Sequence, residues 1–250
     1  MVQFITHYTE KYSYLDSVRI ALEGGCQWIQ LRMKDSPPEE ILPIAEKALA
    51  MCREYNATFI IDDHVSVAKK IHADGVHLGK NDMPVAEARK ILGDRFIIGS
   101  TIHSFEDLSS VLRDSRPDYF GCGPFRFTTT KKNLAPVLGL EGYRDLLDRM
   151  READIHIPVI AIGGIHREDI PQLLVCGVQG IALSGSIINA NDPVEEMRHV
   201  ANLIKSGRDA AHRKYYKINN LSDAYSIISM LLKGVSRKYN SADKKEKIAP

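Results

Sequence analysis

The chain has 250 residues, of which 44% are hydrophobic and 26% charged, and its formal net charge is +1. This length is sufficient for a single α/β barrel domain with a large core. No apolar stretch approaches about 18 residues, so the sequence predicts neither a membrane span nor a signal-peptide core, and we expect a cytoplasmic protein. The cysteines stand singly rather than at metal-ligand spacing, and we expect reduced, buried thiols at Cys26, Cys52, Cys122 and Cys176.

Short apolar or β-branched runs alternate with longer segments of helical periodicity along most of the chain. Eight such runs cover residues 3–7, 28–33, 58–61, 75–78, 96–99, 118–121, 158–162 and 180–183. Amphipathic helical patterns follow at residues 39–55, 85–92, 105–113, 143–150 and 193–204. Eight strand-helix units predict an α/β fold of the (β/α)8 TIM-barrel type. An open doubly wound sheet is the alternative, but it often has a Gly-rich turn after its first strand, where this chain has the sequence His7-Tyr8-Thr9-Glu10.

The last part of the chain differs in charge from the rest. From Lys205 onward there are eleven Lys/Arg and four Asp/Glu, a balance of +7, which leaves −6 for residues 1–204. We therefore predict a barrel domain over residues 1–204 and a basic C-terminal extension over residues 205–250. In this extension, Leu221 to Leu232 is predicted to form an amphipathic helix and residues 236–250 to be disordered. A basic tail is compatible with an acidic partner, although such tails are usually only solvated.

Gln30, Arg32 and Lys34 alternate with Leu31 and Met33 at the end of the second run. Strand periodicity places these three polar side chains on one face. Inside a barrel, an amide and two cations need polar or anionic partners, and a bound diphosphate would supply them. An exposed edge strand with ordinary surface charges is the alternative interpretation.

Carboxylates follow the third and fourth runs. Asp62 and Asp63 follow the third run, residues 58–61, and Asp82 follows the fourth, residues 75–78. Because the carboxyl ends of parallel barrel strands share one rim, these side chains are expected to converge there. Mg²⁺ prefers a few carboxylates together with water and phosphate oxygens, so we predict a Mg²⁺ site at Asp63 and Asp82. Helix capping is the alternative role for either residue taken separately.

Two further segments are typical of phosphate binding. The segment from Gly121 to Lys132, after the sixth run, is rich in hydroxyl and basic side chains, and a solvated surface loop is its alternative interpretation. Gly163-Gly164 and Ser184-Gly185 follow the last two runs, where barrels commonly hold a phosphate on backbone amides. A tight strand-to-helix turn explains either pair equally well.

Taken together, these motifs resemble those of the thiamine-phosphate synthase family over about residues 3–204. The resemblance rests on their order and spacing, and it includes Asp74 to Gly79, Gly123-Pro124 and Ala161 to Ile165. It implies a Mg²⁺-using transferase that joins a hydroxymethylpyrimidine diphosphate to a thiazole phosphate and releases diphosphate. It also implies small-molecule substrates rather than a nucleic acid or a membrane, and it is compatible with a homo-oligomer.

The resemblance also implies roles for individual residues. The pyrimidine diphosphate would be contacted by Gln30, Arg32, Lys34 and Lys131, of which Arg32, Lys34 and Lys131 would act in catalysis by neutralising the leaving group. The thiazole phosphate would be held by Thr128, Thr130, Gly164, Ser184 and Gly185, and Mg²⁺ by Asp63 and Asp82. Asp62 and Thr101 are further substrate-binding candidates and stand where the family often has Asn and Ser. Lys80 stands at a position where the family frequently has Gln.

The implied mechanism is dissociative, since the sequence shows no convincing pair of nucleophile and base. Three alternatives remain at this point. A related barrel group tautomerises a thiazole carboxylate phosphate, for which His103 is the candidate base. The others are a non-catalytic sensor of a phosphate ligand and another phosphate-binding barrel enzyme such as a sugar-phosphate epimerase.

Overall fold

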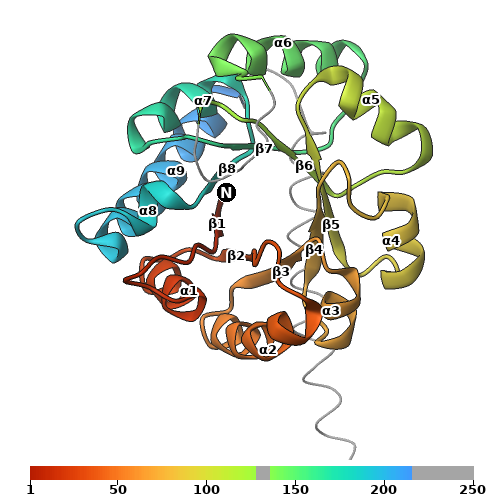
Figure 1. The fold of residues 1–250 in the computed structure, drawn as a ribbon. Coiled ribbons are helices and arrows are strands. Elements are labelled where there is room, and N and C mark those ends of the chain that lie inside the picture. Colours follow the sequence, from red (N-terminus) through yellow and green to blue (C-terminus); the bar gives the residue numbers. More distant parts are fainter. Residues whose placement is uncertain (128–135, 216–250) are drawn as a thin grey trace, which may run out of the picture.

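Eight parallel strands close into a barrel surrounded by helices (Figure 1). The computed structural model of the protein describes residues 1–127 and 136–215. Its strands pair in sequence order, β8 with β1, which confirms the predicted TIM barrel. They are β1 (Val2–Ile5), β2 (Trp28–Leu31), β3 (Thr58–Asp62), β4 (Gly75–Leu78), β5 (Ile97–Ile102), β6 (Tyr119–Cys122), β7 (Val159–Ile162) and β8 (Gly180–Leu183).

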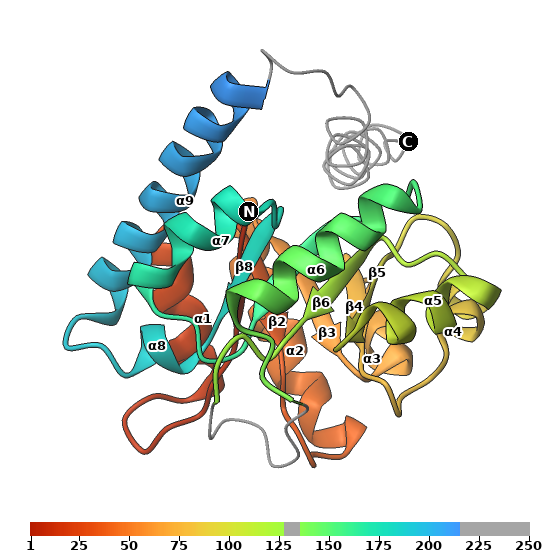
Figure 2. The same ribbon diagram turned by 90° about the horizontal axis from the view of Figure 1, so that it is seen from above.

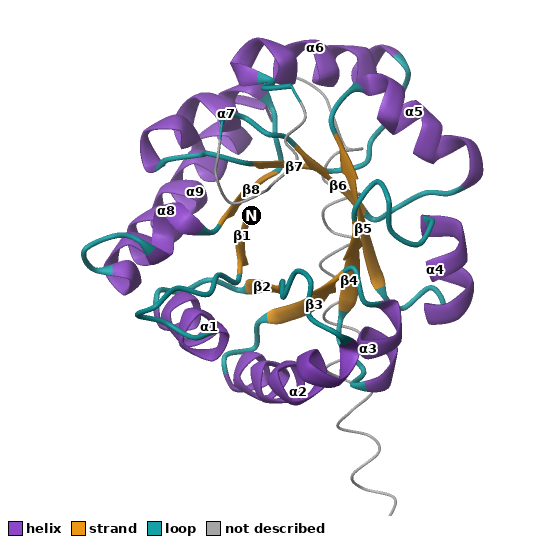
Figure 3. Cartoon of the chain, in the orientation of Figure 1, coloured by secondary structure: helices purple, strands orange, loops and turns teal. Residues whose placement is uncertain are grey.

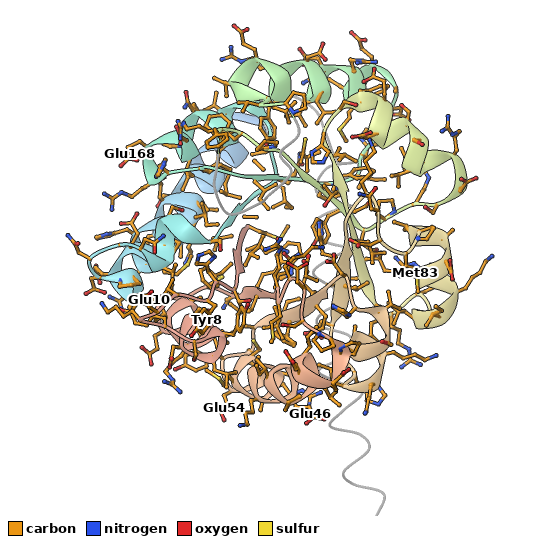
Figure 4. The ribbon with its side chains drawn as sticks, viewed as in Figure 1. Tyr8, Glu10, Glu46, Glu54, Met83 and Glu168 are labelled. Carbon is orange, nitrogen blue, oxygen red and sulfur yellow. The ribbon has the colours of Figure 1, made fainter. Side chains whose placement is uncertain are left out.

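The helices form an outer ring around the strands (Figure 3). They are α1 (Tyr14–Glu23), α2 (Pro38–Glu54), α3 (Val65–Lys70), α4 (Val85–Leu92), α5 (Phe105–Asp114), α6 (Gly139–Glu152), the 3₁₀ turn η1 (Arg167–Asp169), α7 (Ile170–Cys176), α8 (Gly185–Ile188) and α9 (Pro193–Tyr215). Capping side chains mark the first turn of two helices. Ser13 and Asp16 form a capping box at α1, and Ser104 caps α5. Acidic side chains such as Glu46, Glu54 and Glu168 point outward from the ring (Figure 4).

Two apolar layers hold the barrel together. The larger layer lies between strands and helices and includes Phe4, Ile29 and Ile61, all fully buried. The smaller one fills the barrel interior with side chains that include Trp28 and Tyr119. Since successive side chains of a strand point to opposite faces, Gln30 follows Trp28 on the inner face. The interior therefore becomes polar toward the carboxyl ends of the strands.

Some boundaries differ from those predicted. β2 ends at Leu31, so Arg32 and Lys34 lie in the following segment and turn rather than on a continued strand face; Asp35, with a φ of 66°, marks that turn. β5 starts one residue later than predicted and continues to Ile102, which places Thr101 within the strand.

The end of the barrel domain is less sharp than the charge pattern suggests. α9 continues through the predicted boundary at residue 204 as far as Tyr215, and it packs against α1 and α7 (Figure 2). The predicted helix from Leu221 to Leu232 and the polar end of the extension lie outside the described residues. The four cysteines are free thiols, and Cys176 is only partly buried. No helix among the residues described is long and apolar enough to cross a membrane.

Candidate active site

A buried polar cluster lies inside the barrel below the carboxyl ends of the strands. Tyr119 Oη is 2.9 Å from Nδ1 of His77 and accepts a hydrogen bond from Gln3 Nε2 at 3.3 Å. Nε2 of His77 is 2.9 Å from the hydroxyl of Thr101. Burial raises the pKa of the Tyr119 phenol, which therefore stays protonated. Through His77, this cluster links the buried Tyr119 phenol to the hydroxyl of Thr101, a predicted substrate-binding residue.

Gln30 and Ser184 are buried polar residues near the carboxyl ends of the strands. Gln30 is 1% exposed, and its side-chain amide lies beside the phenol of Tyr119. The buried hydroxyl of Ser184 has no hydrogen-bond partner among the described residues. A buried polar atom without a partner is costly, and such atoms in a native protein commonly serve a ligand. Both residues were predicted from the sequence to bind substrate.

The predicted cations and carboxylates of the rim form two ion pairs. Nε of Arg32 lies 3.3 Å from Oδ2 of Asp62, and Nζ of Lys34 lies 2.8 Å from Oδ2 of Asp63. Arg32 and Lys34 follow β2, whereas Asp62 is the last residue of β3 and Asp63 comes directly after it. β2 and β3 are neighbouring strands in register from Trp28↔Thr58 to Leu31↔Ile61. The charge of Asp62 is thus balanced by Arg32.

Asp63 and Asp82 share a hydrogen bond. Asp82 also accepts a hydrogen bond from the backbone N–H of Gly79 at 2.7 Å. Burial, and then the hydrogen bond and charge of Asp63, raise the pKa of Asp82. Burial alone would raise the pKa of Asp63, but its hydrogen bonds with Asp82 and Lys34 outweigh burial and lower it. Two adjacent carboxylates in this state hold a proton between them at acidic pH.

The carboxylate pair fits a divalent cation. Within residues 1–127 and 136–207, whose side chains the structure describes, there is no group of three or more His, Cys, Asp or Glu side chains arranged to hold a metal. Mg²⁺ does not require one, because it is commonly bound by one or two carboxylates, with water and substrate phosphate oxygens in its other positions. Asp63 and Asp82 can offer their oxygens once the shared proton has left.

The turns after β7 and β8 contain Gly164, Ser184 and Gly185, three residues predicted to hold the thiazole phosphate. β7 and β8 are neighbouring strands in register as far as Ile162↔Ala182, so the turns that follow them begin side by side. Gly163 and Gly164 have φ values of 94° and 66°, which favour glycine. A Cβ on Gly164 would lie 2.8 Å from the carbonyl oxygen of Arg126. Gly185 is the first residue of α8.

Other site residues have partners that the sequence did not reveal. Lys80, which follows β4, pairs at 2.7 Å with Asp107 in the first turn of α5. His103 shares a hydrogen bond between its Nδ1 and the carbonyl oxygen of Gly123, and its backbone N–H donates to Asp107. The predicted residues Thr128, Thr130 and Lys131 lie outside the described part of the chain.

Sequence reasoning did not identify His7 and Arg126. His7 follows β1, and burial together with the charge of Arg32 lowers its pKa, so its ring is neutral at pH 7. Arg126 forms a two-pronged ion pair with Asp169, 43 residues away. The position of His7 beyond the first strand was an available signal, whereas nothing in the sequence pattern pairs Arg126 with Asp169.

Polar and charged groups thus gather at the carboxyl ends of the strands of a (β/α)8 barrel, with small residues at the last two turns, as in barrel enzymes that bind phosphate esters. The family described as "Thiamine monophosphate synthase" matches residues 2–187. The chain belongs to this family of transferases.

Individual relatives agree with this assignment. Thiamine-phosphate synthase of Phocaeicola vulgatus is 61% identical over 202 residues, which are 81% of this chain and 97% of that protein. Thiamine-phosphate synthase of Pyrococcus furiosus is 39% identical over 189 residues, 74% of this chain and 87% of the relative. Among solved structures, thiamine phosphate pyrophosphorylase from Pyrococcus furiosus has a TM-score of 0.73 at 35% identity, covering 82% of this chain and 96% of that one.

Proposed function

We propose that this protein condenses 4-amino-2-methyl-5-(diphosphomethyl)pyrimidine with a thiazole phosphate to give thiamine phosphate and diphosphate. The observation that carries the proposal is the junction of Lys34, Asp63 and Asp82 at the ends of neighbouring strands. A cation suits a diphosphate, and two adjacent carboxylates, once deprotonated, suit its divalent metal. The names of the relatives support the same reaction.

The half of the site after β2, β3 and β4 would hold the pyrimidine diphosphate. Arg32 and Lys34 supply positive charge for the diphosphate, assisted by Lys131. Gln30, buried on the inner face of β2, would contact the pyrimidine. Thr101 and Asp62 complete this half.

The turns after β7 and β8 would hold the thiazole phosphate. Gly164 and Gly185 would allow backbone N–H groups to approach phosphate oxygens. The hydroxyl of Ser184, which has no hydrogen-bond partner in the described part of the chain, would bond to the same group. Thr128 and Thr130 would add hydroxyl donors. Binding the two substrates from opposite sides of the rim would bring the thiazole nitrogen to the pyrimidine methylene carbon.

The chemistry we propose is a dissociative substitution. Asp63 and Asp82 would hold Mg²⁺, which when bound neutralises negative charge on the diphosphate. Arg32, Lys34 and Lys131 stabilise that charge further as the bond from the methylene carbon to oxygen breaks. The electron-rich pyrimidine stabilises the resulting cation, and the thiazole nitrogen donates its electron pair to form the new C–N bond. The protein supplies charge and position rather than a covalent nucleophile.

The purified protein tests this proposal directly. With both substrates and Mg²⁺, we expect diphosphate and thiamine phosphate in equal amounts, and a large loss of turnover when the metal is chelated. Conversion of a thiazole carboxylate phosphate tautomer without condensation would instead support the tautomerase with His103 as base. Ligand binding without any turnover would support the sensor, and either result would refute the proposed reaction.

A further inference from the structure

Arg126 connects the segment after β6 with the turn after β7. Its two terminal nitrogens each lie 2.8 Å from one carboxylate oxygen of Asp169, and Nη1 also donates to the carbonyl oxygen of Gly164 at 2.8 Å. The side chain of Asp169 is 8% exposed and accepts a further hydrogen bond from the backbone N–H of His166. We call the contacts of Arg126 with Asp169 and Gly164 the Arg126 latch.

The latch determines how the glycine turn is oriented. Besides the guanidinium contact with Gly164, the backbone N–H of Arg126 donates to the carbonyl oxygen of Gly163 at 2.9 Å. In a trans peptide the C=O and the following N–H point in opposite directions. Both carbonyls are directed at Arg126, so the N–H groups of Gly164 and Ile165 point away from it.

These two N–H groups are available to a ligand. No backbone acceptor in the described part of the chain takes a hydrogen bond from the N–H of Gly164 or Ile165. Successive N–H groups in a turn with left-handed residues form a concave site that favours anions. Such a site binds well only if its peptide planes are held in place before the anion arrives.

We propose that Arg126 is a positioning residue for the phosphate subsite, acting through Gly164 rather than by touching the phosphate. This inference rests on the proposed function. The guanidinium is already committed to three protein acceptor contacts, which hold the Gly163-Gly164 turn against the segment after β6. Asp169 is the second positioning residue of the latch, because its carboxylate fixes the direction of the Arg126 guanidinium.

Steady-state kinetics of the full chain test the latch, with the KM of each substrate measured separately. For Arg126→Gln we expect the KM for the thiazole phosphate to rise about tenfold, the effect of losing roughly one charge-assisted hydrogen bond. The KM for the pyrimidine diphosphate should change less than about twofold. Asp169→Asn should act in the same direction, and the double variant should lose little more than either single one, since both act on one unit.

Arg149→Gln is the matched control. Arg149 is similarly exposed and pairs with Glu106 at 2.7 Å, joining α6 to α5 on the outer ring. Removing this pair should leave both KM values unchanged. Arg126→Lys keeps the charge without the two-pronged geometry and should give an intermediate KM, which provides a second variant if Arg126→Gln does not fold.

The possible results separate the inference from the proposed function. An inactive wild-type protein would refute the proposed function and the latch with it. An active wild type with an unchanged thiazole phosphate KM in Arg126→Gln would refute the latch alone. If Asp169→Asn instead tightens thiazole phosphate binding, the freed guanidinium contacts the phosphate itself, and the positioning role is wrong. Calorimetry with inorganic phosphate should show the same ranking of variants without turnover.

Discussion

Replacing Asp82 with asparagine separates the metal-binding role of this side chain from its structural role. Asn retains an oxygen that can accept the hydrogen bond now made by the N–H of Gly79 at 2.7 Å. Its amide can still donate to Asp63. We therefore expect the free energy of unfolding of Asp82→Asn to stay within about 1 kcal/mol of wild type.

The charge balance of the rim gives the expected size of the functional effect. Arg32 lies against Asp62, and Lys34 lies against Asp63. Asp82 therefore brings the net charge of these five side chains to −1 when all of them are ionised. A unit charge pair about 4 Å apart contributes about 4 kcal/mol at the effective dielectric of a protein surface, and desolvation offsets part of this.

From this balance we expect Asp82→Asn to bind Mg²⁺ about 100-fold more weakly, equivalent to a loss of about 2.7 kcal/mol. Isothermal calorimetry with Mg²⁺ and diphosphate measures this affinity, and thermal melting checks the fold. Asp74→Asn is a matched control, because Asp74 accepts a hydrogen bond from the N–H of Phe59 next to the amino end of β4, away from the rim. Unchanged Mg²⁺ affinity and turnover in Asp82→Asn would remove Asp82 from the metal site.

Three further predictions concern the proton, the barrel interior and the glycine turn. Because Asp82 has a raised pKa and a metal ligand must be deprotonated, the affinity for Mg²⁺ should increase as the pH rises through the pKa of Asp82. Below that pKa, calorimetry in buffers of different ionisation heat should detect the release of a proton on metal binding. An affinity that does not change with pH would contradict the shared proton. Tyr119→Phe removes the oxygen that contacts His77 and Gln3 and should lower the free energy of unfolding by about 1–3 kcal/mol. Denaturant unfolding measures this loss. An unchanged free energy of unfolding would mean that this network does not stabilise the barrel. Gly164→Ala places a methyl group against a backbone carbonyl, in a left-handed conformation that costs a non-glycine residue about 1–2 kcal/mol. This variant should weaken binding of the thiazole phosphate more than binding of the pyrimidine diphosphate. Separate KM values for the two substrates would verify or overturn this order.

The sequence by itself predicted the architecture, which the structure confirms, and the rim at which the candidate site residues would meet. Eight short apolar runs alternating with amphipathic segments predict a parallel barrel over an open sheet, because local hydrophobic periodicity is set by which faces are buried and the number of runs matches a closed barrel. Parallel strands bring their carboxyl ends to one rim, so Asp63 and Asp82 could be placed together although 19 residues separate them in the chain. Their shared hydrogen bond agrees with that expectation.

The tertiary structure alone decided which charged groups meet. Arg32 pairs with Asp62, Lys80 with Asp107, and Arg126 with Asp169 across the turns of the rim. Periodicity encodes which face of an element is buried, but it does not encode the path of a loop or the direction of a long side chain. Those depend on strand register and on the packing of neighbouring turns, which exist only once the barrel has closed.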